Sequence, residues 1–538
     1  MRKGITKRAL SIVLATMMAA MTVVGCGKTT TNSTGSSTGG SYTDYSKGFA
    51  NTVTIKIPVY DRAFEGWDVT NNYYTQWIQK QFGDKYNVKV QYVAIGRTTE
   101  VADYMQMIAA GTAPDIIFNY DMPSAVNYYS EGAIQDVDYN EIANYAPDYY
   151  AKLKDTISTY GKLDGKNAFI FAERTPIYYN FVQLIRQDWL DKVNMTMPTT
   201  LAELDKVLAA WKAAGLGNGG GTLLTKSFNY MYGYLPANLS DKDKALYLDL
   251  NVAPLTWQPT KDYLKEQNTE YNAGLIDKEF YLNVKDTDTK ADFVSGKSGI
   301  YGTYLTSSTD VISSLLANNP TAKVATMDSG ALAVNGKAAF YQNPSYGMIM
   351  GINSKTTAEQ RAAIYMLLNW MSQPDNLFYL QNGVEGQNYT MVDGIATPVA
   401  GYKGESTVSK NSNKDYWCLV QEVAHYDTED KTYKANLKTL APAGYETLIS
   451  DAYKYANKYM SLGVITPIFT KTVASVAEYS ADLNAMWQTD YVDLVTCTPD
   501  QFEAKYTKYS KDYLAAGYQK ILDEKQKLID SNSYIIAK

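Results

Sequence analysis

The stretch over residues 109–118, Ala-Ala-Gly-Thr-Ala-Pro-Asp-Ile-Ile-Phe, constrains the possible fold more than any other part of the chain. Apolar residues recur with helical spacing up to Ala110, and Gly111 is of a residue type that commonly ends a helix. Pro114 disfavours helical geometry in the residue before it. The apolar run that follows is typical of a strand covered on both faces by helices. This order predicts an α/β lobe whose ligand site lies near Asn119, at the carboxyl end of the strand.

Strands and helices are expected to alternate on both sides of this stretch. Residues 53–59 and 88–93 have the pattern of strands, and residues 73–82 between them carry one aromatic and apolar helical face. Such spacing predicts βαβ units and a parallel sheet. Further on, residues 346–352 predict a strand and residues 357–371 a helix. Because 538 residues exceed one ordinary hydrophobic core, we expect at least two domains.

The N-terminal residues have the composition of an export signal. Four basic residues within the first eight positions precede the apolar run 9–24, and the Val-Val-Gly before Cys26 resembles a bacterial lipobox. We therefore expect a signal peptide over residues 1–25, lipidation of Cys26 and a flexible Ser/Thr/Gly-rich tether over residues 26–50. A simple secreted protein or a membrane-anchoring helix is the alternative, although the apolar run is short for a membrane span.

Charge, cysteine and histidine content exclude several classes of function. With 50 basic and 56 acidic side chains the chain is acidic, which excludes an electrostatic surface for nucleic acid. Cys418 and Cys497 could form a disulfide, but we favour two small buried hydrophobic residues. Since His425 is the only histidine, Ser-His, Cys-His and multi-histidine metal sites are excluded.

Short motifs resemble those of one protein family. Residues 113–118, residues 132–137 and the segment 381–389 (Gln-Asn-Gly-Val-Glu-Gly-Gln-Asn-Tyr) resemble motifs of extracellular solute-binding proteins of carbohydrate ABC importers. The family includes the maltodextrin-binding proteins, and the chain is more similar to its large Gram-positive lipoproteins and alginate-oligosaccharide binders. The resemblance runs from about Val53 to the C-terminus, although only these short segments are specific.

The resemblance implies an α/β, two-lobed, periplasmic-binding-protein-like fold with a cleft between lobes joined by several hinge crossings. Lobe one is expected to comprise residues 51–138 and 345–382, and lobe two residues 139–344 and 383–538. It implies a monomeric protein on the outer face of the cytoplasmic membrane, attached only through its lipid. The protein would capture a carbohydrate, an oligosaccharide rather than a monosaccharide, and deliver it to permease subunits. No enzymatic activity, cofactor or metal is expected.

Candidate ligand contacts follow from strand ends, from aromatic content and from the resemblance. The chain has 47 tyrosines and 8 tryptophans, and an aromatic ring can cover the apolar face of a sugar while charged groups bind its hydroxyls. Glu173 and Arg174 are expected between paired strands of lobe two, whereas the segment with Glu385 and Tyr389 is equally compatible with a structural turn. The candidates are Tyr60, Asp61, Arg62, Trp67, Asn119, Tyr120, Asp121, Glu173, Arg174, Tyr301, Tyr304, Tyr346, Glu385, Tyr389 and Trp417.

Other motifs do not meet the requirements of the chemistry they suggest. Gly296-Lys297-Ser298 lacks the first glycine of a phosphate loop, because Ala291 occupies that position. A calcium loop starting at Asp286 would have Lys297 in place of its last oxygen ligand. Related lipoproteins carry a calcium loop near residues 215–221, but this segment has no carboxylate. A glycoside hydrolase, a binding protein for a peptide or other solute and a surface adhesin remain alternatives.

Overall fold

The computed structural model divides the chain into two compact units, Met1–Thr43 and Asp44–Lys538. The structure describes residues 42–63, 66–174, 181–217, 239–248, 252–283, 286–305, 308–328, 340–399, 413–440, 442–459, 461 and 463–536. All helices and strands given below lie in the second unit. The expected signal peptide, Cys26 and most of the expected tether lie outside the described residues.

Strands β1 (Val53–Asp61) and β2 (Val88–Gly96) pair in parallel along their whole length. The connection between them begins with helix α1 (Tyr73–Ile78), where Asn72 caps the first turn. A π-helical turn over Gln79–Gly83 and the short helix α2 (Asp84–Tyr86) complete it. The predicted βαβ unit is confirmed for this pair. The expected extension of the parallel sheet to the strand Ile116–Asn119 is wrong, because that strand pairs antiparallel with residues 349–352.

A second sheet forms around β12 (Tyr346–Asn353), whose eight residues are all buried. Its antiparallel partners are β3 (Ile116–Asn119), β4 (Ile134–Gln135) and β7 (Ile170–Glu173). Helix α3 (Glu100–Ala110) precedes β3 and ends at Gly111, which has a left-handed φ of 70°. The expected strand at residues 346–352 and the helix, stop and strand around Gly111 are thus confirmed.

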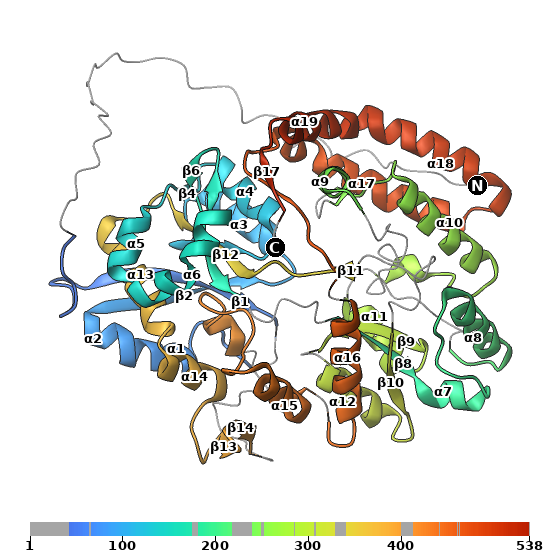
Figure 1. Ribbon diagram of the computed structural model, residues 1–538, viewed down its shortest axis with the longest axis horizontal. Coiled ribbons are helices and arrows are strands. Elements are labelled where there is room, and N and C mark those ends of the chain that lie inside the picture. The colour runs from blue at the N-terminus through green and yellow to red at the C-terminus, as the bar shows by residue number, and fades with distance from the viewer. Residues whose placement is uncertain are drawn as a thin grey trace, which may run out of the picture. The chain divides into compact units, whose positions relative to one another are not determined.

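Helices cover these strands and complete the largest hydrophobic cluster. They are α4 (Met122–Ser130), α5 (Tyr139–Tyr145), α6 (Pro147–Tyr160), α13 (Ala358–Met371) and α14 (Pro374–Asn382). Figure 1 shows α5, α6 and α13 beside β12. Pro147 begins α6 directly after α5, because a proline is favoured at the first position of a helix.

A separate sheet has β8 (Phe181–Arg186) at its centre, with β9 (Ile300–Tyr304) and β10 (Val324–Met327) antiparallel on either side. The expectation that Glu173 and Arg174 lie between two paired strands is wrong, because β7 pairs with β12 and β8 pairs with β9 and β10. An apolar run reports burial but does not specify the partner strand. The helices of this part are α7 (Gln187–Lys192), α8 (Leu201–Ala213), α11 (Asp286–Val294), α12 (Ser308–Asn318), α15 (Glu429–Thr439) and α16 (Glu446–Tyr459).

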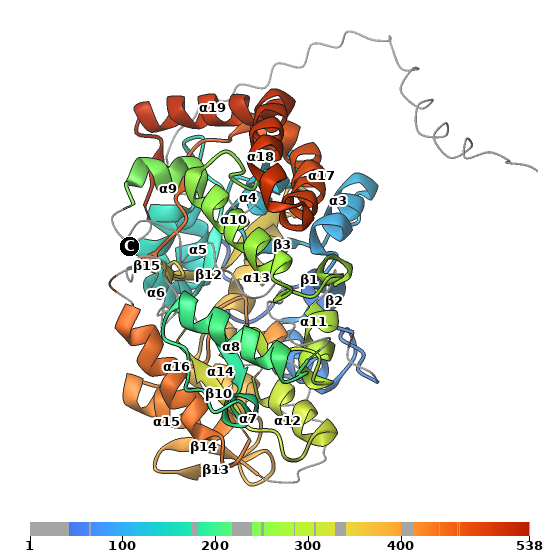
Figure 2. The same ribbon diagram turned by 90° about the vertical axis from the view of Figure 1, so that its right-hand side faces the viewer.

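A third part is helical. Figures 1 and 2 show α10 (Gln258–Asn272), α17 (Ala474–Thr496) and α18 (Pro499–Tyr513) side by side, and they share one hydrophobic cluster. Helices α9 (Asp241–Tyr247) and α19 (Gln519–Asp530) contact each other. The remaining strands form two-stranded pairs: β5 (Lys162–Leu163) with β6 (Lys166–Asn167), β11 (Phe340–Tyr341) with β15 (Gly463–Val464), β13 (Tyr389–Val392) with β14 (Ile395–Pro398), and β16 (Ile468–Phe469) with β17 (Tyr534–Ile535).

One hydrophobic cluster contains residues that we assigned to both expected lobes. The largest cluster joins residues from 49–172 with residues from 346–380 and 416–420. Residues 142–172, which we assigned to lobe two, therefore contribute side chains to the same cluster as β1 and β12. The lobe boundaries stay a prediction.

Cys418 and Cys497 are buried and free, as expected for small hydrophobic residues. Among the residues that the structure describes, no helix is both long and apolar enough to cross a membrane.

Candidate functional site

Polar side chains gather where several strands of the first part end. Strand β1 ends at Asp61, β2 is followed by Arg97, and β3 is followed by Tyr120. Strand β7 ends at Glu173, whose backbone bonds to Val420 and Glu422. The segment over residues 413–425 thus lies against the strand ends.

Hydrogen bonds, ion pairs, cation–ring contacts and, for Asp121, charge interactions with Arg97 and Arg174 join these residues into one group, here called the strand-end cluster. Its members are Tyr60, Arg62, Arg97, Tyr120, Asp121, Glu173, Arg174, Lys414, Asp415, Glu422 and His425.

Two tyrosine rings form the aromatic centre of the cluster. The rings of Tyr60 and Tyr120 stack at 6.0 Å between centroids, with 18° between their planes. The guanidinium of Arg97 lies 4.9 Å from the Tyr60 centroid and 5.5 Å from the Tyr120 centroid. The Lys414 ammonium lies 5.7 Å from the Tyr120 centroid. Cations at these distances are attracted by the ring quadrupole and fix the position of the rings.

Glu100, in the first turn of α3, contacts both Tyr60 and Arg97 and so helps to hold them in place. Its carboxylate accepts a short hydrogen bond from the Tyr60 hydroxyl and pairs with Arg97 at 3.1 Å. Burial raises the pKa of the Glu100 carboxyl from 4.5 to about 7, although the Tyr60 hydrogen bond and the Arg97 charge both act to lower it. Tyr60 is only 1% exposed, so its ring is buried in the core, where the Tyr120 ring stacks on it.

Two ion pairs attach the 413–425 segment to the strand ends. Arg62 donates two hydrogen bonds to Asp415, from Nε at 2.8 Å and from Nη2 at 2.9 Å. The Glu422 Oε1 atom lies 2.6 Å from the Lys414 Nζ atom and 3.9 Å from Arg174 Nη2. Such charged pairs combine donors and acceptors in one place, as recognition of hydroxyl groups requires.

Gly347, on β12, allows Glu422 to lie this close to the sheet. A Cβ atom at Gly347 would lie 2.4 Å from the Cβ atom of Glu422 and 3.4 Å from the carbonyl oxygen of Glu173. Neither atom is the far end of a flexible side chain, so a larger residue at 347 would displace the segment. The sequence offers no sign of this close approach.

Three buried polar atoms at the cluster have no hydrogen-bond partner among the described residues. They are the Tyr120 hydroxyl, the Trp417 Nε1 atom and the Glu422 Oε2 atom. Trp417 is 4% exposed and Glu422 is 8% exposed. Buried polar groups are normally paired, so each of these exceptions calls for an explanation. The described residues therefore leave two donors and one acceptor of the cluster unpaired.

Asp121 lies at the edge of the cluster and is exposed to solvent. The protein around its carboxylate still raises the pKa of Asp121, while the charges of Arg97 and Arg174 oppose this effect. Its backbone N–H is held by Asn119 Oδ1 at 2.8 Å, and Asn119 is 2% exposed. Asn119 therefore supports the turn from inside, and Asp121 presents a carboxylate to solvent.

The other predicted contacts are more scattered. The Trp67 ring packs edge-on against Tyr74, and Tyr346 is buried beside Glu173 in the sheet register. Tyr301 lies on β9, in the hydrophobic core beside the sheet of β8, β9 and β10, and stacks on Phe293. The side chain of Tyr304 lies outside the described residues.

Glu385 and Tyr389 lie in a turn, closed by a hydrogen bond from the Gly386 N–H to the Tyr389 carbonyl. Glu385 is exposed, whereas Tyr389 is 9% exposed and packs edge-on against Phe378. This geometry is that of the structural turn considered as the alternative, and their ligand contact stays a prediction.

Sequence reasoning missed several members of the cluster. Arg97 directly follows β2, so the strand-end rule that selected Tyr60 and Tyr120 could have identified it. Lys414, Asp415 and Glu422 carried no comparable signal, because they reach the cluster through a long return of the chain.

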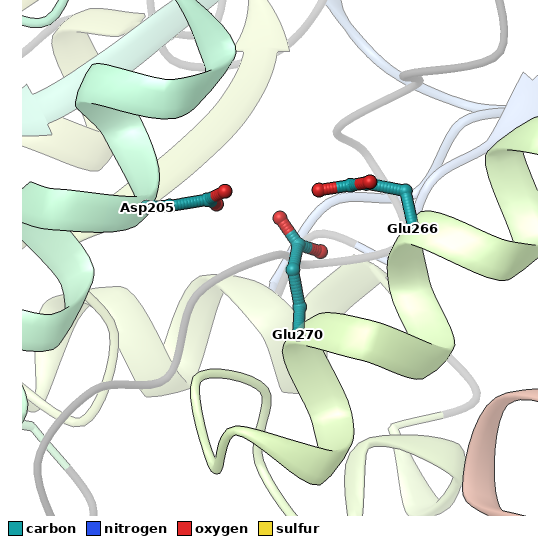
Figure 3. A group of neighbouring side chains, drawn as sticks. All are labelled: Asp205, Glu266 and Glu270. Atoms are coloured by element: carbon teal, nitrogen blue, oxygen red, sulfur yellow. The ribbon is translucent and has the colours of Figure 1, made fainter. Parts of the chain in front are cut away.

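A group of carboxylates elsewhere can be considered as a metal site. Asp205 on α8 and Glu266 and Glu270 on α10 point toward one another, as Figure 3 shows, and one oxygen from each lies within 4.8 Å of the others. Burial raises the pKa of Asp205 and of Glu266, and the nearby Asp205 charge contributes to the shift of Glu266. Oxygen ligands of this kind suit a hard divalent cation. The group lies on two helices and not in the segment 215–221.

Comparison with known proteins identifies the family. The family model for bacterial extracellular solute-binding proteins matches residues 77–386, which is more than half of the chain. The chain is 23% identical over 367 residues to the polygalacturonan/rhamnogalacturonan-binding protein YtcQ of Bacillus subtilis, covering 64% of this chain and 68% of that protein. It is 24% identical over 348 residues to the lipoprotein LipO of the same organism, covering 58% of this chain and 66% of LipO.

Solved structures agree with this identification. The alginate-binding protein AlgQ2 without calcium superimposes with a TM-score of 0.64 at 19% identity, covering 90% of this chain and all of AlgQ2. The Streptococcus pneumoniae substrate-binding protein FusA, in complex with kestose, gives a TM-score of 0.63 at 17% identity, with 89% and 99% covered. The predicted two-lobed α/β fold is confirmed. The chain belongs to the bacterial extracellular solute-binding proteins.

Proposed function

We propose that the chain captures a carbohydrate outside the cell and delivers it to the permease of an ABC importer, while Cys26 anchors it to the membrane by a lipid. The observation that carries this proposal is the strand-end cluster. There a stacked tyrosine pair lies among charged groups and three buried polar atoms that have no hydrogen-bond partner among the described residues. YtcQ is a polygalacturonan/rhamnogalacturonan-binding protein, AlgQ2 is an alginate-binding protein, and FusA was solved in complex with kestose. These similarities support the choice of a carbohydrate as the ligand class.

The chemistry of the cluster suits a sugar. The exposed part of the Tyr120 ring can cover the apolar face of a pyranose, while its hydroxyl and the Trp417 N–H donate to sugar oxygens. The Glu422 carboxylate can accept from a sugar hydroxyl. A ligand that also contacts the second lobe would favour a closed state through its higher affinity for that state. The permease would then recognise the closed protein, and no bond of the ligand would be broken.

The first experiment measures thermal unfolding of the mature chain from residue 26 onward, carrying Cys26→Ala, with a panel of plant, host and microbial oligosaccharides. A ligand at about 100 times its dissociation constant adds about 2.7 kcal/mol to the free energy of unfolding. A shift with one glycan family, and an unchanged glycan by mass spectrometry, is expected. A cleaved glycan would indicate a hydrolase, and shifts from peptides alone would mean another solute class.

Matched variants connect the shift to the cluster. Tyr120→Ala removes the stacked ring and should lower the affinity for the glycan by at least about tenfold, which corresponds to about 1.4 kcal/mol. Tyr281→Ala removes a tyrosine that is 40% exposed and is not a member of the cluster, and it should bind normally. Equal effects of the two substitutions would contradict this location of the site.

A further inference from the structure

We infer that the ligand of the strand-end cluster is an uncharged oligosaccharide and not a polyuronate such as those named for YtcQ and AlgQ2. This inference rests on the proposed function and adds the charge class of the sugar. It depends on how the basic side chains at the strand ends are already paired.

Each basic side chain of the cluster has a carboxylate of the protein beside it. Arg62 is held by both oxygens of Asp415, and Arg97 by Glu100. A ligand carboxylate could reach these guanidinium groups only in competition with these pairs. Asp415 is 4% exposed, so displacing it would leave a buried charge without its partner, which is costly.

The other basic groups are engaged in the same way. Lys414 and Arg174 share the Glu422 carboxylate, and Lys152 of α6 pairs with Glu173. Side-chain exposure is 12% for Arg174 and 35% for Lys414, so Arg174 in particular has little open surface for a second anion.

Counting charges around the cluster shows no excess of positive charge among the described residues. Five basic side chains face six carboxylates. The basic groups are Arg62, Arg97, Lys152, Arg174 and Lys414, and the carboxylates are those of Asp61, Glu100, Asp121, Glu173, Asp415 and Glu422.

Two of these carboxylates are open to solvent. Asp61 and Asp121 are both exposed, and within the described ranges neither forms an ion pair within 4.0 Å. A chain of uronic acids would bring its carboxylates toward these like charges, which disfavours binding. Unpaired charges that repel the wrong ligand are a recognised source of specificity.

Hydroxyl groups meet no such obstacle. Each guanidinium retains N–H donors beyond those used in its ion pair, and the carboxylates retain acceptor lone pairs. Further donors and an acceptor come from three groups without a partner among the described residues: the Tyr120 hydroxyl, the Trp417 N–H and the Glu422 Oε2 atom. None of these groups adds a positive charge that would attract an anionic ligand. A neutral sugar can use both kinds of group at once without breaking an ion pair.

The test compares sugars that differ only in charge. Oligogalacturonides and oligomannuronates are titrated into the mature chain beside their carboxyl-reduced counterparts, which keep each linkage but carry a hydroxymethyl group at C6. The neutral glycan found by thermal unfolding is included. We expect the neutral member of any pair that binds to bind at least about tenfold more tightly. Its affinity should change little between about 50 and about 500 mM NaCl, since screening acts on charged ligands.

Asp121→Asn removes one carboxylate that repels uronates. It should reduce the ratio between the affinity for the neutral sugar and the affinity for its uronate counterpart. Glu131→Gln removes an exposed carboxylate at the end of α4, outside the cluster and the predicted ligand contacts, and should leave the preference unchanged. A preference of the unmodified chain for uronates that weakens with salt would overturn the inference and leave the proposed function intact. If Asp121→Asn prefers neutral sugars over uronates as strongly as the unmodified chain does, repulsion by Asp121 is not a source of the specificity. If no glycan binds and peptides shift the thermal unfolding, both the inference and the proposed function are wrong.

Discussion

Glu100 shows how burial changes a single carboxyl group beside the site. In the folded chain its pKa is about 7, compared with 4.5 for an ordinary glutamate. Between these two values the folded chain binds more protons than the unfolded chain. The free energy of unfolding therefore falls as pH rises through this window, and the loss is complete above the folded pKa.

The corresponding substitution is Glu100→Gln, which keeps an acceptor for Tyr60 but cannot ionise. The wild-type free energy of unfolding should fall by on the order of 3 kcal/mol from Glu100 between about pH 4.5 and pH 8. Urea unfolding across this range should show a smaller decline for Glu100→Gln. Glu131→Gln alters an exposed glutamate and should follow the wild type. Parallel curves for Glu100→Gln and wild type would contradict the assigned titration.

At the scale of elements, strand β12 positions the segment that carries Glu422. Gly347→Ala places a methyl group 2.4 Å from the Glu422 Cβ atom and should displace that segment. The affinity for the glycan should fall by at least about tenfold, or about 1.4 kcal/mol, as measured by calorimetric titration.

Gly351→Ala is the matched control on the same strand. Its methyl group would lie 2.4 Å from the Cδ1 atom of Ile134, in the core and away from Glu422. It should destabilise the fold by overpacking, typically by about 1–3 kcal/mol, while the affinity of the folded fraction stays normal. Similar affinity losses in both variants would mean that strand crowding, and not displacement of Glu422, is responsible.

Helix α13 depends on its N-terminal cap. Thr357 accepts a hydrogen bond from the Gln360 N–H, and the Gln360 side chain accepts one from the Thr357 N–H. Thr357→Ala should lower the free energy of unfolding by about 1 kcal/mol, whereas Thr357→Ser retains the hydroxyl and should cost less. Equal losses in chemical denaturation would show that the cap hydrogen bond is not the source.

At the scale of the whole molecule, the proposed function requires lobe closure on the ligand. Small-angle scattering of the mature chain should show a smaller radius of gyration with saturating glycan than without it. Tyr120→Ala at the same glycan concentration should show a smaller change. Tight binding with an unchanged radius would favour an adhesin, which binds without closure.

The proposed anchor can be tested separately from the binding site. Cys26→Ala should abolish incorporation of labelled fatty acid and move the protein from the membrane fraction into the medium, since acyl chains provide the membrane affinity. Wild-type protein that carries no lipid on Cys26 would contradict the anchor and leave carbohydrate binding unaffected.

Sequence patterns predicted local elements well where the hydrophobic period was clear. The strands at Val53–Asp61 and Tyr346–Asn353 and the helix stop at Gly111 follow from side chains close together in the chain. The pairing of β7 was not predictable in this way, because register and partner depend on residues more than a hundred positions away. Tyr301 lies on a strand as expected and packs in a hydrophobic core, so its ligand contact stays a prediction.

The sequence by itself determined the α/β class, the family resemblance and the concentration of polar residues at strand ends, because these are properties of short segments. Only the tertiary structure decided which charges meet. It brings Asp415 and Glu422 to Arg62 and Arg174, places Gly347 against Glu422, and buries Glu100 so that its pKa rises. Ion pairing and burial depend on distances through space, and the order of residues does not specify those distances.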